Sequence, residues 1–306
     1  MNPNPLKQLE LFIHGNILKN LIFLYQENKL PNKILLKGRK GIGKSTLAYH
    51  LINFILSKDE DFGYDIDHSK IDVRNKSFKL VNNGTSPNFF LIDVQTDKKN
   101  INIEQIRNII KDLNKSSLNN KPKFVLIDNS EYLNKSSINA LLKDIEEPNS
   151  NAYFILIQNQ KTLLSTLTSR FIKFNVSLTN EESIFVVNKL IKDDIHNLVN
   201  KDLINYYFSP GNMYKIIMFC NENDIDLKNV ELKEFIKILI KNNHIKKQTN
   251  IRYIFYELIE YLLKKKSMLI NMDYYNYFVK KIEIINKFNL DEESFLIELN
   301  DKILND

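Results

Sequence analysis

Two spacings of apolar residues alternate over the first 178 positions of the chain. Apolar residues three or four positions apart predict helices at about 16–28, 44–57, 102–114, 136–147 and 162–169. Short continuous apolar runs predict strands at 33–37, 89–94, 123–128, 153–157 and 171–176. Because buried strands alternate with helices, the pattern predicts an α/β fold whose parallel sheet is covered on both faces.

The pattern changes near Leu178. Thr179 and Glu182 have the spacing of a capping box, which predicts a helix to about Ile191. Beyond it only helical spacing follows, over 211–222, 230–242, 249–265, 272–288 and 291–304. The sequence therefore predicts three domains, at 1–178 (α/β), 179–227 (small and helical) and 228–306 (all-α).

Composition narrows the class of protein. Of the 306 residues, 43% are hydrophobic and 26% charged, which excludes global disorder. The one cysteine, Cys220, cannot form an internal disulfide or a cysteine-based zinc site, and this favours a reducing compartment. The N-terminus lacks the pattern of a signal peptide, and no apolar run approaches the length of about 18 residues that a membrane span needs. We expect a cytoplasmic protein without zinc or membrane contact.

The net charge of +6 is mild for a chain of this length. It permits contact with nucleic acid, but acidic residues are interspersed and no block of Lys and Arg forms a basic arm. Charge alone therefore assigns no partner.

The strongest local signal is a glycine-rich segment between a predicted strand and a predicted helix. It fits the pattern G-x-x-x-x-G-K-[ST] of a phosphate-binding loop. In such a loop Lys44 reaches the β- and γ-phosphates and the Ser45 hydroxyl coordinates Mg²⁺. The predicted nucleotide-binding residues are Gly38, Arg39, Lys40, Gly41, Ile42, Gly43, Lys44, Ser45 and Thr46. Within the loop, Arg39 and Lys40 occupy variable positions.

A second signal is the apolar strand that ends in Asp128, about 80 residues after the loop. An acid in this place is expected to hold the Mg²⁺ shell together with Ser45, although a simple strand-end cap is the alternative. ATPases of this kind usually place a glutamate next, whereas this chain has Asn129. An amide cannot accept a proton from water, and Glu131 is two positions too far along. The sequence predicts slow hydrolysis.

A third signal is Ser169-Arg170, which follows a predicted helix. An arginine in such a place is usually a surface ion-pair partner. In an assembly of P-loop subunits it is instead able to reach the γ-phosphate of a neighbour as an arginine finger.

These motifs together resemble a known family. The segments GRKGIGKSTLA, SPNFFLIDV, INIEQIRNIIKDL, KFVLIDNSEYLNKSSINALLKDIEEP and YFILIQNQKTLLSTLTSRF, with a later SPGNM, have the order and spacing of the bacterial clamp-loader AAA+ proteins. Within that group the chain is most similar to the delta prime subunits of DNA polymerase III. The resemblance covers about residues 5–215; the C-terminal 90 residues match only in being helical.

The resemblance implies a fold, a role and partners. It implies a RecA-like AAA+ domain, a helical lid and a C-terminal collar domain. The collar would join gamma/tau and delta subunits in a ring that binds ATP and loads the beta sliding clamp on primer-template DNA. The Ser-Arg-Cys motif of the family supplies an arginine finger in trans, and it corresponds to Ser169-Arg170-Phe171 here, with Phe in place of Cys.

Three departures from the family pattern bear on activity. Residues 58–88 contain none of the cysteines of a zinc module that many relatives carry there. Asn212 stands where the family often has a lid arginine, and Asn129 where it has a glutamate. Together they imply a subunit that hydrolyses ATP weakly or not at all, so that its status as an enzyme is open.

Other interpretations remain for the same residues. One is a gamma/tau-type motor subunit that hydrolyses ATP itself, which Asn129 and Asn212 count against. Another is an AAA+ helicase loader or initiator, which usually adds a basic DNA-reading module. A P-loop kinase is a third, but no segment after Asp128 resembles an acceptor-binding lid. His14, His50 and Cys220 are interpreted as structural residues.

Overall fold

The computed structural model describes residues 4–95, 98, 100–113, 115, 119–146, 151–159, 163–204, 208–241, 249–267, 272–288, 290 and 292–304. The chain divides into two compact units. The first unit comprises Met1–Leu190 with Ser209–Gly211, and the second comprises Ile191–Phe208 with Asn212–Asp306.

A five-stranded parallel sheet forms the centre of the first unit, in the order β2-β3-β4-β1-β5. Every predicted strand is confirmed to within two residues at either end. The strands are β1 (Lys33–Lys37), β2 (Phe89–Ile92), β3 (Lys123–Ile127), β4 (Ala152–Gln158) and β5 (Ile172–Asn175).

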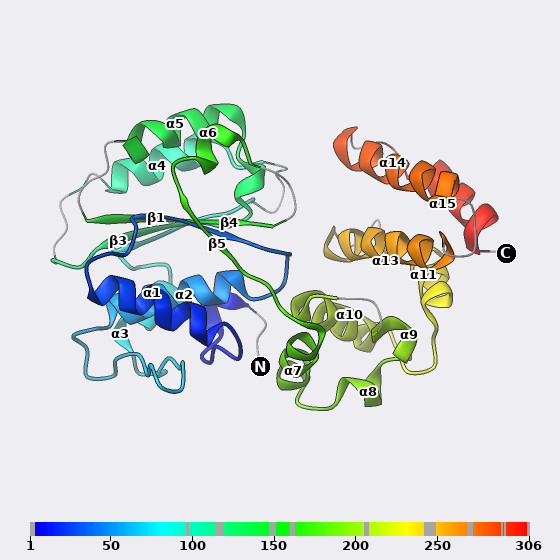
Figure 1. Cartoon of the computed structure of the whole chain (residues 1–306), viewed down its shortest axis with the longest axis horizontal. Coiled ribbons are helices and arrows are strands. Elements are labelled where there is room, and N and C mark those ends of the chain that lie inside the picture. Colours follow the sequence, from blue (N-terminus) through cyan, green and yellow to red (C-terminus); the bar gives the residue numbers. More distant parts are fainter. Residues whose placement is uncertain are drawn as a thin grey trace. The chain divides into compact units, whose positions relative to one another are not determined.

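Helices cover both faces of this sheet (Figure 1). One layer contains α1 (Gly15–Gln26), α2 (Lys44–Leu56) and α3 (Lys76–Asn82), and the other α4 (Ile103–Leu113), α5 (Lys135–Glu146) and α6 (Ser165–Thr168). Successive strand residues face opposite layers, so Ile34 and Leu36 join the α1–α2 core while Leu35 joins the α4–α5 core. This explains why the central strands are apolar without alternation.

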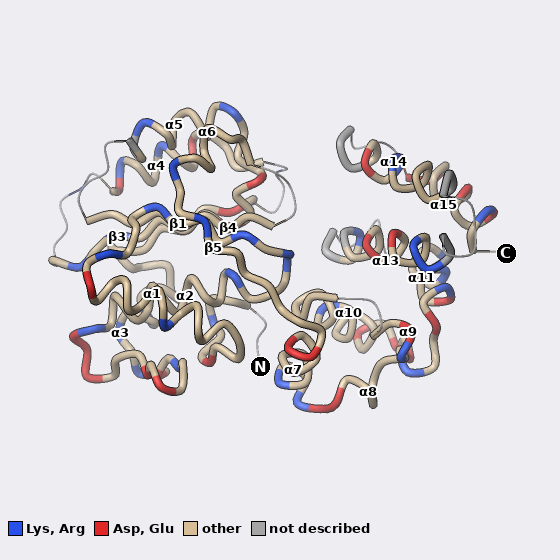
Figure 2. The backbone as a smooth tube through the Cα atoms, in the orientation of Figure 1, with Lys and Arg blue, Asp and Glu red and all other residues tan. Residues whose placement is uncertain are grey.

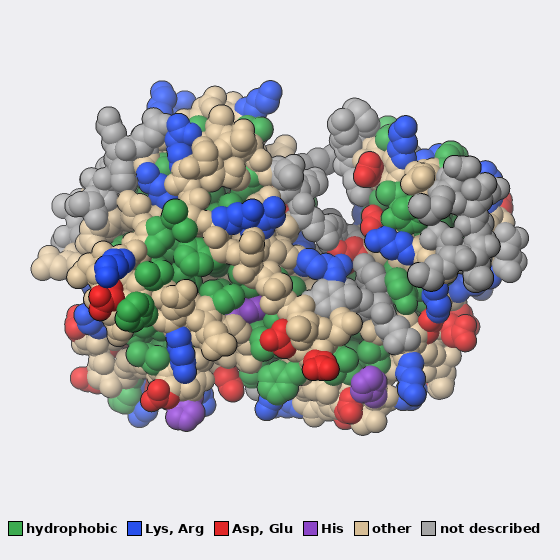
Figure 3. Space-filling view, viewed as in Figure 1, with side chains coloured by type: hydrophobic (Ala, Val, Ile, Leu, Met, Phe, Trp, Pro, Cys, Tyr) green, Lys and Arg blue, Asp and Glu red, His purple; other side chains and the backbone are tan. Residues whose placement is uncertain are grey.

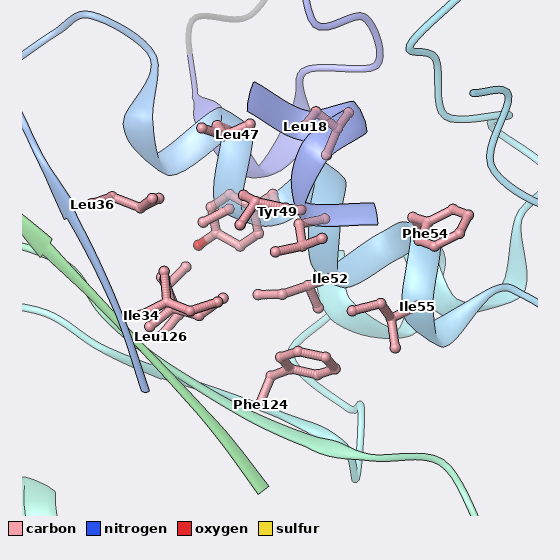
Figure 4. Packing of buried hydrophobic residues seen from close by; sticks show 14 of the residues in the cluster. Leu18, Ile34, Leu36, Leu47, Tyr49, Ile52, Phe54, Ile55, Phe124 and Leu126 are labelled. Carbon is pink, nitrogen blue, oxygen red and sulfur yellow. The ribbon is translucent and has the colours of Figure 1, made fainter. Parts of the chain in front are cut away.

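The core beneath α1 and α2 is packed from several elements (Figure 4). Leu18 of α1 and Leu47 of α2 are almost fully buried, as are Ile34 of β1 and Phe124 of β3. Burying a side chain of this size stabilises the fold by about 1.5–3 kcal/mol. The packing fixes the start of α2, and therefore the end of the loop that precedes it.

The sequence did not predict α3, α8 (Ile195–Leu198) or α9 (Lys201–Ile204). These helices have 7, 4 and 4 residues, too few for an apolar spacing to repeat. The start of α3 is fixed by a cap instead, because the Asn75 side chain accepts a hydrogen bond from the N–H of Phe78 at 2.7 Å.

All described secondary-structure elements of the second unit are helices. Its described helices are α8, α9, most of α10 (Pro210–Glu222), α11 (Leu232–Lys241), α13 (Thr249–Ser267), α14 (Met272–Phe288), α15 (Glu293–Leu299) and the π-helix η3 (Asn300–Leu304). The helix α7 (Asn180–Ile191) lies almost wholly in the first unit. Phe255, Phe278 and Phe295 are nearly fully buried and form its aromatic core. The predicted helical C-terminal region is confirmed.

Polar contacts join α9 and α10 to the later helices of the second unit. Asp202 of α9 accepts hydrogen bonds from the Leu232 N–H at 3.1 Å and from Lys265 of α13. Asn212 of α10 donates to the Glu257 carboxylate of α13 at 3.0 Å. The domain boundary predicted between residues 227 and 228 lies inside this unit and stays a prediction.

Cys220 on α10 is buried, with 1% of its surface exposed, and burial raises the pKa of its thiol to about 12.

Charged residues of both signs are spread along the backbone of both units (Figure 2). None of the helices in the described part of the chain is long and apolar enough to cross a membrane.

Candidate functional site

The glycine-rich loop connects β1 to α2, as predicted. Gly41 and Gly43 have φ angles of +81° and +93°, in the left-handed region that favours glycine. Gly38 is required for a different reason, because a Cβ atom there would lie 2.2 Å from the carbonyl oxygen of Val176. The backbone just after β5 thus lies too close to the first residue of the loop for any side chain there.

Lys44, the first residue of α2, is buried, with 3% of its surface exposed. Its ammonium group donates to the Gly38 carbonyl at 3.0 Å and to the Asn159 Oδ1 at 2.9 Å. Burial lowers the pKa of Lys44 to about 8, against the opposing charges of Asp128 and Glu131. A buried cation next to backbone amides is suited to receiving an anion.

Ser45 and Asp128 meet as predicted. The Ser45 hydroxyl donates to the Asp128 carboxylate at 2.7 Å. Ser45 follows β1 in the chain and Asp128 follows β3, and β4 lies between these two strands in the sheet. Burial raises the pKa of Asp128, and the nearby charge of Asp93 raises it further. A divalent cation would offset both effects, and a hydroxyl with a carboxylate is the oxygen donor set that Mg²⁺ prefers. The residues present therefore fit a Mg²⁺-nucleotide.

Asn129 follows Asp128 with a left-handed φ of 51°. Its amide donates to Asp93 at 2.8 Å, and its carbonyl oxygen accepts from the Asn159 amide at 3.0 Å. The Asn159 N–H in turn donates to Glu131 at 3.2 Å. A continuous polar chain thus runs from Lys44 to Asp93.

Sequence reasoning missed Asn159 in this chain of contacts. Asn159 directly follows β4, the strand between β1 and β3, and so lies at the carboxyl edge of the sheet beside Lys44 and Asn129. The available signal was the end of the apolar run YFILI, two residues before Asn159. The position of a strand within the sheet, however, cannot be inferred from that run.

Two contacts from outside the loop hold its middle. The His14 Nε2 lies 2.7 Å from the Ile42 carbonyl oxygen, and the Gly211 N–H donates to the Gly41 carbonyl at 2.9 Å. The buried side chain of Ile42 fixes the loop further. Of the other predicted loop residues, Arg39 is exposed, and Lys40 and Thr46 are partly buried.

Arg170 lies in the turn after α6, in the layer opposite α2. Its side chain is exposed, and its Nη1 donates to the Thr166 carbonyl at 2.6 Å. The next residue, Phe171, has 6% of its surface exposed and packs in the α4–α5 core. The replacement of Cys by Phe therefore anchors the backbone beside the arginine.

Residues 13–180, more than half of the chain, match the family model described as "DNA polymerase III, delta subunit". The chain belongs to this family. The matched segment contains the glycine-rich loop, Asp128, Asn159 and Arg170.

Relatives in the family carry the delta prime name. The chain is 27% identical over 297 residues to DNA polymerase III subunit delta′ of Buchnera aphidicola subsp. Schizaphis graminum, covering 91% of this chain and 84% of that one. It is 31% identical over 164 residues to the delta′ subunit of Buchnera aphidicola subsp. Baizongia pistaciae, covering 52% of this chain and 47% of that one. The DNA polymerase III subunit gamma of Buchnera aphidicola subsp. Schizaphis graminum is 27% identical to it over 223 residues, covering 70% of this chain and 59% of that one. The resemblance predicted from the sequence is confirmed.

Solved structures that can be aligned with this chain include a DNA polymerase III gamma subunit-related protein of Thermotoga maritima. That protein is 17% identical, with a TM-score of 0.40 over 94% of this chain and 92% of that one. The RuvB Holliday junction branch migration motor of the same organism is also 17% identical, with a TM-score of 0.41 over 79% and 81%.

The parallel sheet and its covering helices confirm the α/β fold class that the sequence predicted. The segment between α2 and β2, in which the sequence has no cysteine, folds around α3. In the part of the chain that the structure describes, no group of three or more His, Cys, Asp or Glu residues is placed to hold a metal ion.

Proposed function

We propose that this chain is the delta prime subunit of a DNA polymerase III clamp loader, a stator that supports the ATP-driven loading of the beta clamp. The observation that carries the proposal is an exposed Arg170 on a family fold whose own site has Asn129 after Asp128. The subunit would contribute a catalytic side chain to a neighbour while doing little chemistry itself.

The proposed ligand of the loop is a Mg²⁺-nucleotide. The loop N–H groups and Lys44 would bind the phosphates, and Ser45 and Asp128 would hold the metal ion. Mg²⁺ supplies charge neutralisation on the phosphates when it is bound. Binding requires Lys44 to exchange its contacts with Gly38 and Asn159 for phosphate oxygens.

Turnover at this site is expected to be weak. Asn129 has no basic group for an attacking water, and its amide is already engaged with Asp93 and Asn159. The Glu131 carboxylate is bound to the Asn159 N–H at 3.2 Å and so is held away from the replaced position. The site is suited to binding a nucleotide rather than to hydrolysing it.

Arg170 is proposed to act as the arginine finger of the adjacent gamma/tau subunit. Its exposed guanidinium donates to the Thr166 carbonyl, and a phosphate oxygen would accept a stronger, charge-assisted hydrogen bond from the same group. Two apolar residues of the same stretch of chain are exposed, at 45% for Leu164 and 56% for Ile172. Apolar side chains are visible near β5 on the face in Figure 3. Exposed apolar side chains and an exposed arginine in one stretch of chain are typical of a protein interface.

The remaining assignments complete the proposal. Residues 1–178 would be the nucleotide-binding domain, 179–227 the lid and 228–306 the collar. The collar would join gamma/tau and delta subunits in the cytoplasm, and the ring would contact the beta clamp and primer-template DNA.

The test is clamp loading by a reconstituted ring that contains variants of this chain. Arg170→Ala is expected to leave assembly intact and to slow ATP hydrolysis and loading by about 10³-fold or more, the range found when an arginine finger is removed. Lys44→Ala should have a much smaller effect. Arg107→Ala, an exposed arginine on α4, is the matched control and should load normally. Equal losses from the Arg170 and Lys44 variants would contradict this division of roles.

A gamma/tau-type ATPase is the second candidate, because the loop, Ser45 and Asp128 are all in place. It is tested by ATP binding and steady-state hydrolysis of the isolated chain, with and without primed DNA. Negligible turnover supports the stator, whereas clear turnover would favour the motor subunit.

A further inference from the structure

His14 makes a contact that neither the predicted motifs nor the proposed function use. It is the N-cap of α1 and has a left-handed φ of 70°. Its side chain is buried, and its Nε2 lies 2.7 Å from the carbonyl oxygen of Ile42 in the glycine-rich loop. Since a carbonyl oxygen only accepts, Nε2 must carry a proton and donate it.

This bond determines the orientation of one loop peptide. All described peptide bonds are trans, and in a trans peptide the C=O and N–H groups point in opposite directions. The Ile42 carbonyl points to His14, so the Gly43 N–H points away from it. Backbone N–H groups in this loop are the donors that bind phosphate.

The neighbouring peptide is held in the same manner. The Gly211 N–H donates to the Gly41 carbonyl at 2.9 Å, so the N–H of Ile42 points away from Gly211. A Cβ on Gly211 would lie 3.1 Å from the Gly41 Cα, which leaves the contact no spare room. The His14 side chain and the Gly211 backbone, which come from two distant segments, thus fix the orientations of two consecutive loop peptides.

We propose that His14 is a positioning residue for the phosphate-binding loop. Its bond to the Ile42 carbonyl orients the Ile42–Gly43 peptide so that the Gly43 N–H group can bind a phosphate oxygen. The proposal rests on the proposed nucleotide site. The imidazole also lies close to the next residue, since a Cβ built on Gly43 would be in van der Waals contact with the His14 Cδ2 at 3.7 Å.

The surroundings keep the imidazole neutral. Burial lowers the pKa of His14, and the nearby ammonium of Lys44 on α2 acts in the same direction. Glu182 on α7 opposes both effects. The neutral form with its proton on Nε2 makes the observed bond, whereas a neutral form protonated on Nδ1 would place a lone pair against the Ile42 oxygen.

The first test is imidazole ¹⁵N NMR of the full chain at pH 7.5. We expect His14 as the neutral tautomer protonated on Nε2. A neutral tautomer protonated on Nδ1 would overturn the proposal whether or not the chain binds nucleotide.

The second test compares two variants by their Kd for MgATP, with folding verified by circular dichroism. His14→Leu removes the donor, and we expect the Kd to rise by about tenfold, the effect of one lost buried hydrogen bond. His14→Gln replaces Nε2 with an amide donor at a similar distance and should stay within about threefold of the natural chain. An unchanged affinity in His14→Leu, or an equal loss in both variants, would overturn the proposal.

Failure of the proposed function is distinguishable from failure of this inference. If the natural chain binds no MgATP, the nucleotide site is wrong, and His14 is then judged by the ¹³C shift of the Ile42 carbonyl. That shift should change in His14→Leu and persist in His14→Gln. An unchanged shift in both variants would mean that His14 does not hold the loop.

Discussion

At the scale of single residues, the contacts of Asn129 predict that a glutamate at this position alone will not support ATP hydrolysis. We expect Asn129→Glu to give no more than a trace of ATPase activity. The left-handed backbone directs this side chain to Asp93 and Asn159, so a new carboxylate would face the Asp93 carboxylate rather than a water.

The same substitution should lower the free energy of unfolding by about 1–2 kcal/mol, because it places two carboxylates side by side. Urea unfolding and a steady-state ATPase assay measure the two effects. Asp93→Asn combined with Asn129→Glu is the control and should recover most of the stability. Turnover of about 1 s⁻¹ or more in the single variant would refute this account.

Lys44 should leave a signature in the pH dependence of stability. Its pKa in the folded chain is about 8, below the value of 10.5 for a free lysine. Between these values the unfolded chain binds more protons, so the stability that Lys44 costs at pH 7 is regained as the pH rises.

From pH 7 to pH 9.5 the natural chain should therefore gain about 1–2 kcal/mol relative to Lys44→Met, which has no group to titrate. Urea titrations of both chains at several pH values give the difference, in which the other ionisable groups largely cancel. A difference that is constant with pH would show that Lys44 is charged as easily in the folded chain as in the unfolded one.

At the scale of elements, the junction of β1 and the loop depends on Gly38. Gly38→Ala should destabilise the chain by about 3 kcal/mol or more, because its Cβ would lie 2.2 Å from the Val176 oxygen and 2.8 Å from Ile42 Cδ1. Gly15→Ala is the matched control, since its Cβ would meet only Ser69 Oγ at 3.7 Å. Chemical unfolding of both variants measures the contrast, and similar losses would mean that β5 yields to the added methyl group.

The sequence predicted those helices that are long enough for the apolar spacing to repeat and those strands that form a continuous apolar run. It placed β1 at Lys33–Lys37 and began α2 at Lys44, because the loop motif separates them clearly. It missed α3, whose start depends on a side-chain cap at Asn75.

Within the candidate site, the residues found from the sequence belong to local motifs, such as Lys44 and Asp128. The residues missed, His14 and Asn159, act through tertiary contacts over 28 and 115 positions along the chain. Their contacts follow from the packing of the start of α1 against the loop and from the place of β4 in the sheet. No local pattern encodes either fact.

At the scale of the whole molecule, Asp202 ties the short helix α9 to both α11 and α13. Asp202→Ala should reduce the free energy of unfolding of the full chain by about 1–3 kcal/mol, because it removes a helix-capping acceptor and an ion-pair partner together. Asp301→Ala, which is exposed, is the control. Thermal unfolding compares them, and equal melting temperatures would argue against Asp202 as a link.

The chemistry of Cys220 has a practical consequence for experiments on the assembly. Since its thiol is buried with a pKa of about 12, almost no thiolate is present near neutral pH to attack a maleimide. A cysteine introduced at an exposed position such as Arg107 would then carry a fluorophore alone, without removal of the natural thiol. Fluorescence from such a label would follow the joining of this subunit to its neighbours in real time.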